Sequence, residues 1–293
     1  MRRTGAWLIL LAAMTSVVAT CTTAGAGELK ADSAGLITFW NDDPSPSIWT
    51  VRPDGSGRGR VLRNRQNAKR ARLSPDRGWI AFDGNPPGEP TLSDFDIQLV
   101  RRNGSGLRTL TRSNLWDTDP QWSPDGKLIS FTRAPEADWT KAWIWTIRRN
   151  GSRPQPLVRG QRGRWSPDGV HLVYDAPTTG SPGDLFVVDA DGRNRRLLLG
   201  SRQLDQPADW SPDGKRILFT RFDDTSPATS VWVVNVDGTG ARRLSAGLAG
   251  SWSPDSSEIV YARSFPGRLF VMSRNGTRNR AIPGAVGADP DWG

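Results

Sequence analysis

The sequence predicts an all-β protein: a six-bladed β-propeller made of four-stranded antiparallel blades. Three observations favour this fold class. A Trp-Ser-Pro-Asp-type motif recurs at intervals of 49, 43, 45 and 42 residues, counted between Ser74, Ser123, Ser166, Ser211 and Ser253. Two further sequence columns each have six members. The residues between the motifs favour strands and turns, and a repeat of roughly 40 to 50 residues of that kind is typical of propeller blades.

The motif itself predicts a strand followed by a tight turn. In one repeat, Pro120-Gln121-Trp122 forms the strand and Ser123-Pro124-Asp125-Gly126 forms the turn. This order suits a type I turn, because Ser favours the first position, Pro fixes φ at the second, and Gly closes the turn. The strand that follows, Lys127 to Thr132, has the alternation expected of a strand with one buried face.

The third strand and the hairpin after it supply the six-member columns. The third-strand column pairs an aliphatic residue with a large one: Ile48-Trp49, Ile97-Gln98, Ile144-Trp145, Leu185-Phe186, Val231-Trp232 and Leu269-Phe270. The hairpin column contains Asp-Gly or Asn-Gly: Asp54-Gly55, Asn103-Gly104, Asn150-Gly151, Asp191-Gly192, Asp237-Gly238 and Asn275-Gly276. Such dipeptides predict two-residue hairpin turns. We interpret the aromatic columns as packing between blades.

The two ends of the repeat region predict how the ring closes. The first blade begins at residues 35–39 without a preceding motif, and the chain ends on Asp289-Pro290-Asp291-Trp292-Gly293, which has the Trp without the turn. We expect this C-terminal strand to join the N-terminal blade, which closes the ring and removes free sheet edges. The propeller is thus predicted over residues 35–293, after a short linker at 27–34.

Residues 1–26 have the features of an export signal. A basic start is followed by an apolar run, Ala6 to Ala19, that is too short for a stable membrane span, and then by small residues. Two processing sites remain open. Val18-Ala19-Thr20-Cys21 resembles a bacterial lipobox and makes Cys21 a lipidation candidate, whereas Ala24-Gly25-Ala26 fits ordinary cleavage. The protein is expected to be periplasmic, extracellular or anchored as a membrane lipoprotein.

Composition narrows the classes of partner. Cys21 is the only cysteine, so no internal disulfide can form. The formal net charge is +9, and it becomes +7 without residues 1–26, which contain two Arg and no acid. A basic exported protein can contact anionic lipid or wall polymer. Nucleic acid is not an expected partner in that compartment, and we expect a monomer.

The repeated Trp-Ser-Pro-Asp-Gly, followed by an Ile/Leu-x-Phe strand and an Asp-Gly or Asn-Gly hairpin, resembles the TolB-type propeller repeat, also described as the WD40-like PD40 repeat. The resemblance covers about residues 35–292. It implies a fold shared with periplasmic TolB, bacterial surface lipoproteins and non-catalytic domains of prolyl-oligopeptidase-type peptidases. TolB carries a separate N-terminal domain, whereas here only about eight residues separate the predicted signal peptide from the first strand, so we expect a bare propeller.

Chain connectivity predicts which face carries function. In a four-stranded meander alternate connections share a face, so the motif turns and hairpins lie together. The variable second-to-third-strand loops and the blade connections lie opposite, where binding is usual. Carboxylates that lead into the inner strands are expected at the mouth of the central channel: Asp117, Asp119, Asp205, Asp209, Asp289 and Asp291. They are solvated turn formers, or else a site for a basic peptide or for Ca²⁺. We expect no other cofactor.

Two further groups of side chains stand out. Trp116, Trp139 and Trp143 lie outside the repeat columns, on the same variable face, where they either pack locally or contact a sugar or peptide. Arginines cluster on the third and outer strands and their hairpins: Arg101, Arg102, Arg148, Arg149, Arg195, Arg196, Arg242 and Arg243. They protect sheet edges against pairing or contact an anionic envelope surface.

The sequence offers little support for catalysis. It has no Gly-x-Ser-x-Gly motif, no His/Cys cluster, and a single histidine, His171, placed just after a structural turn. The leading hypothesis is therefore a non-enzymatic exported scaffold that engages a protein or peptide in the cell envelope through its variable-loop face. The alternatives are a carbohydrate-binding or carbohydrate-active propeller and a purely structural envelope lipoprotein.

Overall fold

The computed structural model describes residues 35–42, 46–62, 67–85, 95–136, 138–223 and 228–293. The chain divides into two units, Met1–Ser33 and Ala34–Gly293. The predicted signal peptide, the lipidation candidate Cys21 and the linker at 27–34 lie outside the described residues. In the described part no helix is long and apolar enough to cross a membrane.

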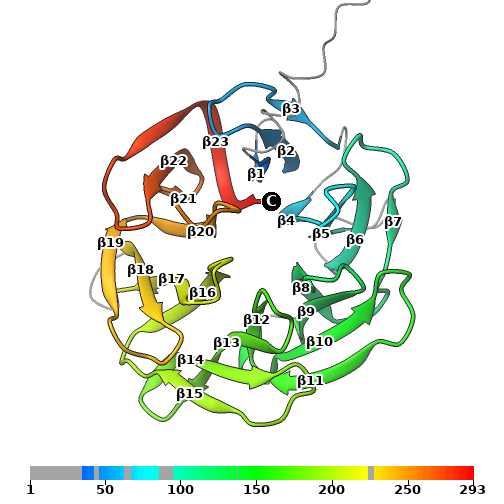
Figure 1. Ribbon diagram of the computed structural model, residues 1–293. Coiled ribbons are helices and arrows are strands. Elements are labelled where there is room, and N and C mark those ends of the chain that lie inside the picture. The colour runs from blue at the N-terminus through cyan, green and yellow to red at the C-terminus, as the bar shows by residue number, and fades with distance from the viewer. Residues whose placement is uncertain (1–34, 43–45, 63–66, 86–94, 137, 224–227) are drawn as a thin grey trace, which may run out of the picture. The chain divides into compact units, whose positions relative to one another are not determined.

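The second unit is an all-β propeller, as predicted, with its sheets arranged around a central axis (Figure 1). Four sheets have four strands in meander order, all pairs antiparallel. Their bounds are β4 (Lys69–Leu73), β5 (Trp79–Gly84), β6 (Asp96–Arg101), β7 (Arg108–Thr109); β8 (Trp116–Trp122), β9 (Leu128–Ala134), β10 (Trp143–Arg148), β11 (Gln155–Arg159); β12 (Gln161–Trp165), β13 (His171–Thr178), β14 (Ser181–Asp189), β15 (Arg196–Leu199); β16 (Leu204–Trp210), β17 (Arg216–Phe222), β18 (Thr229–Asn235) and β19 (Arg242–Ala246). A short 3₁₀ helix, η1 (Trp139–Lys141), precedes β10.

The fifth sheet joins the two ends of the propeller. It has seven strands in the order β20 (Leu248–Trp252), β21 (Glu258–Ala262), β22 (Gly267–Ser273), β23 (Arg280–Trp292), β1 (Ile37–Asn41), β2 (Ser47–Val51) and β3 (Gly59–Arg60). Strand β23 pairs with β22 through Arg280 and with β1 through Trp292. The predicted closure by the C-terminal strand is therefore confirmed, and it leaves no open edge between the two ends of the ring.

The motif turns are type I turns, as predicted. The amide of Gly126 donates to the carbonyl of Ser123 at 2.8 Å, and the Ser123 hydroxyl donates to Asp125 at 2.7 Å. Neighbouring turns lie against one another, because a Cβ on Gly126 would come within 3.8 Å of Pro75 in the preceding sheet. This contact repeats between Gly169 and Pro124 at 3.7 Å. The turns thus form a compact, uniform face.

The prediction of two-residue hairpins is wrong. The amide of Gly151 donates to the carbonyl of Arg148 at 2.7 Å, while the Arg148 amide donates to the carbonyl of Ser152 at 3.0 Å. Gly151 has a φ of 86°, but Asn150 is not among the residues with positive φ. A two-residue type I′ loop needs positive φ at both central residues. The hairpin is instead a three-residue loop that places only its glycine in the left-handed region.

The aromatic columns pack within and between sheets, as predicted. Cross-strand aromatic neighbours meet in three of the sheets, for example Tyr174 with Phe186 at 5.8 Å and Phe219 with Trp232 at 6.1 Å between ring centroids. One apolar cluster joins Val187 of β14 to Trp210 of β16, across two sheets. This burial fixes the sheets to one another, so the inner strands form a rigid wall around the axis.

Candidate binding site in the central channel

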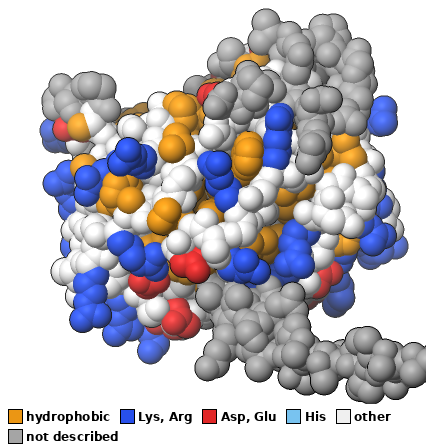
Figure 2. Space-filling model, turned by 90° about the horizontal axis from the view of Figure 1, so that it is seen from above, with side chains coloured by type: hydrophobic (Ala, Val, Ile, Leu, Met, Phe, Trp, Pro, Cys, Tyr) orange, Lys and Arg blue, Asp and Glu red, His pale blue; other side chains and the backbone are white. Residues whose placement is uncertain are grey.

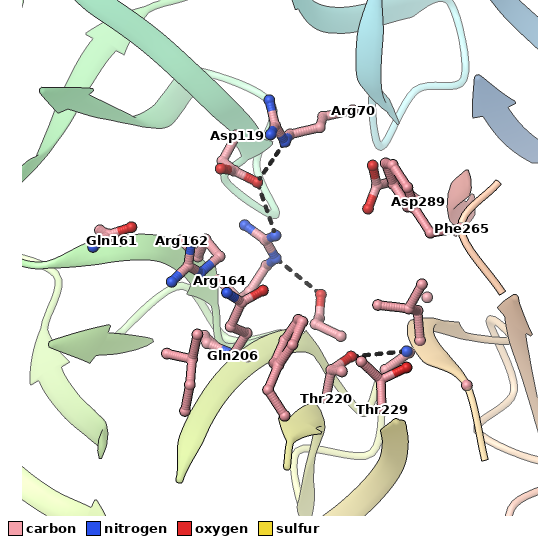
Figure 3. A pocket seen from close by; sticks show the side chains of 18 of the residues that line it. Arg70, Asp119, Gln161, Arg162, Arg164, Gln206, Thr220, Thr229, Phe265 and Asp289 are labelled. Atoms are coloured by element: carbon pink, nitrogen blue, oxygen red, sulfur yellow. Dashed lines mark hydrogen bonds and ion pairs between the residues drawn. The ribbon is translucent and has the colours of Figure 1, made fainter. Parts of the chain in front are cut away.

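A cavity of about 1100 Å³ lies among the inner strands (Figure 3). Its rim includes residues at the ends of second-to-third-strand connections: Trp139, Thr140, Pro177, Pro182, Phe222 and Phe265. The starts of the inner strands form the rest of its wall. Described residues from several of the connections that the sequence analysis assigned to the variable face therefore line one cavity.

A backbone irregularity recurs in the inner strands and directs side chains into this cavity. The pairing register between the first and second strands shifts just before the motif Trp, or before Leu73 in β4. Such a shift marks a β-bulge. At the third position before the motif Trp or Leu73, φ is positive: 48° at Arg70, 53° at Asp119, 54° at Arg162 and 47° at Asp289. Positive φ is uncommon for such residues, and bulges reorient the side chains they carry. All four residues line the cavity.

The lining is more basic than the sequence analysis predicted. Among the described residues it contains six cationic side chains and two carboxylates, Asp119 and Asp289; the cations are Lys69, Arg70, Arg72, Arg162, Arg164 and Arg263. Sequence reasoning missed these cations because it counted acids on the loops. The sequence did contain a signal for two of these cations. Arg70 and Arg162 lie three residues before the motif Trp or its equivalent Leu73, at the same position as Asp119, which was predicted at the channel mouth.

Asp119 lies at the centre of the basic group (Figure 3). Its carboxylate is 3.6 Å from Nε of Arg70 and 3.7 Å from Nη2 of Arg164. Burial would raise the pKa of Asp119, but Arg70, Arg164, Arg162 and Arg72 together hold the pKa below its ordinary value. Asp119 therefore stays ionised and links the arginines of β4 and β12.

Two buried carboxylates orient Arg162 and Arg70 from behind. Arg162 donates two hydrogen bonds to Asp175, at 2.9 Å and 2.6 Å, and Arg70 donates one to Asp83 at 2.8 Å. Asp175 and Asp83 are buried and lie outside the cavity lining. The bidentate contact with Asp175 fixes the plane of the Arg162 guanidinium, and the single hydrogen bond to Asp83 anchors one Nη atom of Arg70. Both arginines line the cavity.

Arg164 is buried without full charge compensation. Its side chain is 4% exposed, and it donates to the backbone carbonyls of Ala208 at 2.9 Å and Gly163 at 3.2 Å. Burial and the nearby Arg72 lower the pKa of Arg164 to about 10, and Asp119 opposes this only in part. The floor of the cavity therefore carries a surplus of positive charge.

The opposite wall is apolar and aromatic. Its residues come mainly from β16 and β20: Leu204, Pro207, Ala208, Leu248 and Ala249. Trp40 and Phe265 close this side, with ring centroids 5.4 Å apart, and the indole of Trp40 donates to Asp289 at 2.7 Å. Figure 3 shows Arg162, Arg164 and two glutamines on one side of the cavity, and Asp289 and Phe265 on the other.

The structure separates the six predicted channel carboxylates into three pairs. Asp119 and Asp289 line the cavity. Asp117 and Asp205 are fully buried, and each accepts two hydrogen bonds of 2.6–2.8 Å from one arginine, Arg133 and Arg221 respectively. These two carboxylates face an arginine of the neighbouring strand, which satisfies both of their oxygens.

Asp209 and Asp291 connect neighbouring inner strands. Asp209 accepts from the Trp252 amide at 2.9 Å, and Asp291 accepts from the Leu73 amide at 2.9 Å. Burial raises the pKa of Asp209 to about 7, even though two backbone amides favour its ionised form. These carboxylates occupy the position directly before the motif Trp, and their contacts hold the ring together.

Two of the three predicted tryptophans lie together. Trp139 lines the cavity and meets Trp116 edge to face at 5.8 Å, while Trp116 meets Phe95 at 5.5 Å. Trp143 is apart from this cluster, with 38% of its surface exposed and the guanidinium of Arg159 6.0 Å above its ring. Trp143 is thus the most exposed of the three.

The predicted basic perimeter is present on the third and outer strands. Of its eight arginines, all except the half-buried Arg149 are exposed. The face shown in Figure 2 carries many Lys and Arg side chains and few Asp or Glu side chains.

Within the described residues no group of three or more His, Cys, Asp or Glu could hold a metal ion. His171 adjoins a motif turn, where its amide donates to Ser166 at 2.9 Å.

Comparisons with known proteins agree with this fold. The solved structure of TolB from Acinetobacter baumannii matches with a TM-score of 0.75 at 22% identity, over 89% of this chain and 67% of that one. An uncharacterised protein of Agrobacterium fabrum is 28% identical over 171 residues, 56% of each chain. The Tol-Pal system protein TolB of Anaeromyxobacter dehalogenans is 30% identical over 116 residues, 37% of this chain and 26% of that protein. No protein-family model matches the chain.

The fold and the cavity together define the class of protein: an all-β propeller with a cavity among its inner strands. More particularly, the chain has a TolB-like β-propeller, as the resemblance predicted, because it matches the propeller region of TolB in structure and in sequence. The match does not cover the N-terminal domain of TolB. The chain spans about half the length of the Agrobacterium relative and a quarter of the Anaeromyxobacter one.

Proposed function

We propose that this protein is a non-enzymatic binding scaffold that receives a segment of a protein or peptide in its central channel. The observation that carries this proposal is the cavity of about 1100 Å³, which has a cationic wall facing an apolar one. Ligand sites in proteins have volumes of about 300–1000 Å³ and combine apolar surface with a few placed polar groups. An extended chain can present both chemistries, through its side chains, to opposite walls.

The remaining architecture and location follow the sequence analysis. We count the seven-stranded sheet as two blades that share β23 (Arg280–Trp292), which gives six blades with the four separate sheets. Residues 1–26 support export to the cell envelope, with Cys21 as the lipidation candidate. The exposed perimeter arginines favour contact with an anionic envelope surface. The lack of a Gly-x-Ser-x-Gly motif supports a non-enzymatic role.

Carbohydrate binding is the second candidate, and the exposed ring of Trp143 favours it. Exposed aromatic rings can stack on sugars. Trp143→Ala tests this candidate on an array of envelope glycans: glycan binding by the wild type that the variant loses would support it. Glycan binding that the variant retains, or no glycan binding, would reject a site at Trp143.

The peptide proposal is tested by selecting linear peptides from a phage-displayed random library on the propeller. Affinities are then measured by fluorescence polarisation. Gln206→Trp places a large ring in the cavity, since Gln206 lines it and is half-buried. Leu197→Trp is the matched control, because Leu197 is 54% exposed on the outer strand β15.

We expect Gln206→Trp to weaken the selected peptides by about 10-fold or more, the equivalent of about 1.4 kcal/mol, and Leu197→Trp to leave them unchanged. Both variants should keep the wild-type unfolding transition, measured by tryptophan fluorescence. A library that yields no binders, or binders that tolerate Gln206→Trp, would refute binding in the channel.

A further inference from the structure

We propose that the channel selects a carboxylate-bearing segment: an Asp, a Glu or a C-terminal carboxylate that binds the arginines of β4 and β12. This inference rests on the proposed peptide-binding function and names the chemistry of that site. The arginines concerned are Arg70, Arg72, Arg162 and Arg164, which flank Asp119 on β8. Guanidinium groups bind carboxylates and phosphates through charge-assisted hydrogen bonds, and a carboxylate has two oxygens that can each accept from a different arginine.

The charge balance of the lining is the first argument. The described lining has six cationic side chains against two carboxylates. The carboxylates that compensate Arg162 and Arg70, namely Asp175 and Asp83, lie behind them and outside the lining. A ligand in the cavity therefore meets guanidinium groups first. Buried positive charge without full compensation is unfavourable, and an incoming anion relieves it.

Unused donors on two arginines are the second argument. Arg162 binds Asp175 through Nε and Nη2, and Arg70 uses Nη1 for Asp83 and Nε for Asp119. Within the part of the chain that is described, no hydrogen bond is recorded from Nη1 of Arg162 or from Nη2 of Arg70. Each arginine thus keeps an N–H pair for a ligand while its own position is fixed by a carboxylate, which preorganises the site.

The carboxylates of the lining argue for a singly charged ligand group. Asp119 lies within 3.7 Å of two arginines, and Asp289 lines the cavity close to Arg70. Both would repel a phosphate dianion more strongly than a carboxylate. The apolar wall formed by Pro207 and Ala249 faces the arginines, so residues next to the acidic one are expected to be apolar.

The test compares each selected peptide with its charge-neutral form, in which Asp or Glu becomes Asn or Gln and a terminal carboxylate becomes an amide. On the wild-type propeller we expect the neutral form to bind about 10-fold or more weakly, because hydrogen bonds between charged partners are roughly twice as strong as neutral ones. This measurement needs no protein variant, so it stands even if a cavity variant fails to fold.

A protein variant locates the effect. Arg162→Gln with Asp175→Asn removes an ion pair at the cavity without changing net charge. Arg280→Gln with Glu258→Gln removes a surface pair, 3.0 Å long, also without changing net charge. We expect the first double variant to lose much of the preference for the acidic peptide over its neutral form, and the second to discriminate between them as the wild type does.

The possible failures are distinct. Peptides that depend on the cavity, being sensitive to Gln206→Trp, but that show no acidic enrichment and no loss on neutralisation would overturn the carboxylate inference and leave the peptide-binding proposal standing. Acidic peptides that bind equally well to Gln206→Trp would place the anion elsewhere on the basic surface and overturn both. Retention of the full acid preference by the Arg162/Asp175 variant would remove Arg162 from the site.

Discussion

Asp117→Asn is the substitution that most directly tests whether the buried Asp–Arg pairs are structural. Asp117 was predicted at the channel mouth, yet its side chain is fully buried and accepts hydrogen bonds of 2.6 Å and 2.7 Å from Arg133. Arg133 also lies over the Trp145 ring, 4.6 Å from its centroid, and keeps 16% of its surface exposed. Asparagine keeps the size of the side chain and removes the charge.

The expected loss is about 3 kcal/mol of unfolding free energy. Removing one partner of a buried ion pair costs about 3–5 kcal/mol, because the other charge is left buried without compensation. The lower end applies here since Arg133 retains some contact with solvent and keeps its aromatic neighbour. Replacing both residues, as Asp117→Asn with Arg133→Gln, should cost less than the single change, because no lone charge remains.

Urea unfolding followed by tryptophan fluorescence measures these differences. The chain offers an internal replicate: Asp205 and Arg221 form the equivalent pair two sheets further on, at 2.7 Å and 2.8 Å. Asp205→Asn should therefore destabilise by a similar amount, within about 1 kcal/mol. A loss below about 1 kcal/mol for Asp117→Asn, or additive losses in the double variant, would refute a structural role for the pair.

The other predictions concern closure, turn geometry and pH. Trp292→Ala should cost about 3–5 kcal/mol in urea unfolding, since Trp292 is 7% exposed and pairs with β1 at the closure; a loss under 1 kcal/mol would mean that closure adds little. Gly238→Ala should destabilise more than Gly180→Ala, because both have φ near 87° but only Gly238 would bring a Cβ to 2.4 Å from a carbonyl, that of Leu198; equal losses would contradict this. The folded-state pKa of Asp209 is about 7, above the ordinary 3.8, so the folded protein holds a proton that the unfolded chain has lost, and this contribution to stability falls as pH rises from about 4 to about 7. Asp209→Asn should therefore lose less stability than the wild type between pH 4.5 and pH 7.5, and equal losses would oppose the assignment.

The fold was predictable because its determinants repeat along the chain. Each inner strand ends in the same turn, and each third strand places a large residue opposite an aromatic one, as Trp145 lies opposite Phe131. Six weak signals at one spacing reinforce each other. The hairpin type was mispredicted because Asn-Gly is compatible with two loop lengths, and the hydrogen bonds at Arg148 decide between them.

The site was only partly predictable because its contacts cross between strands that are distant in sequence. Arg70 and Arg164 both approach Asp119, although they are 49 and 45 residues away from it along the chain. No local pattern shows that Asp117 faces an arginine on the next strand whereas Asp119 faces the cavity. That difference follows from the bulge, which changes the direction of one side chain within a strand.

The bulge separates the chemistry of the channel from the stability of the ring. Directly before the motif Trp, Asp209 and Asp291 bind backbone amides of the next inner strand, so their substitution affects the ring itself. Two positions earlier in the chain, the bulge position carries a different side chain in each strand. These residues are Arg70 in β4, Asp119 in β8, Arg162 in β12, Pro207 in β16, Ala249 in β20 and Asp289 in β23.

Because such different side chains occupy one backbone position, that position tolerates change while the turns, columns and amide contacts around it stay the same. The charge and shape of the channel can therefore vary strand by strand without loss of the fold. In this protein the variation places both bulge arginines, Arg70 and Arg162, on either side of Asp119, and the small or apolar residues opposite. This separation of a cationic half from an apolar half is the physical basis for expecting one orientation of a bound acidic segment.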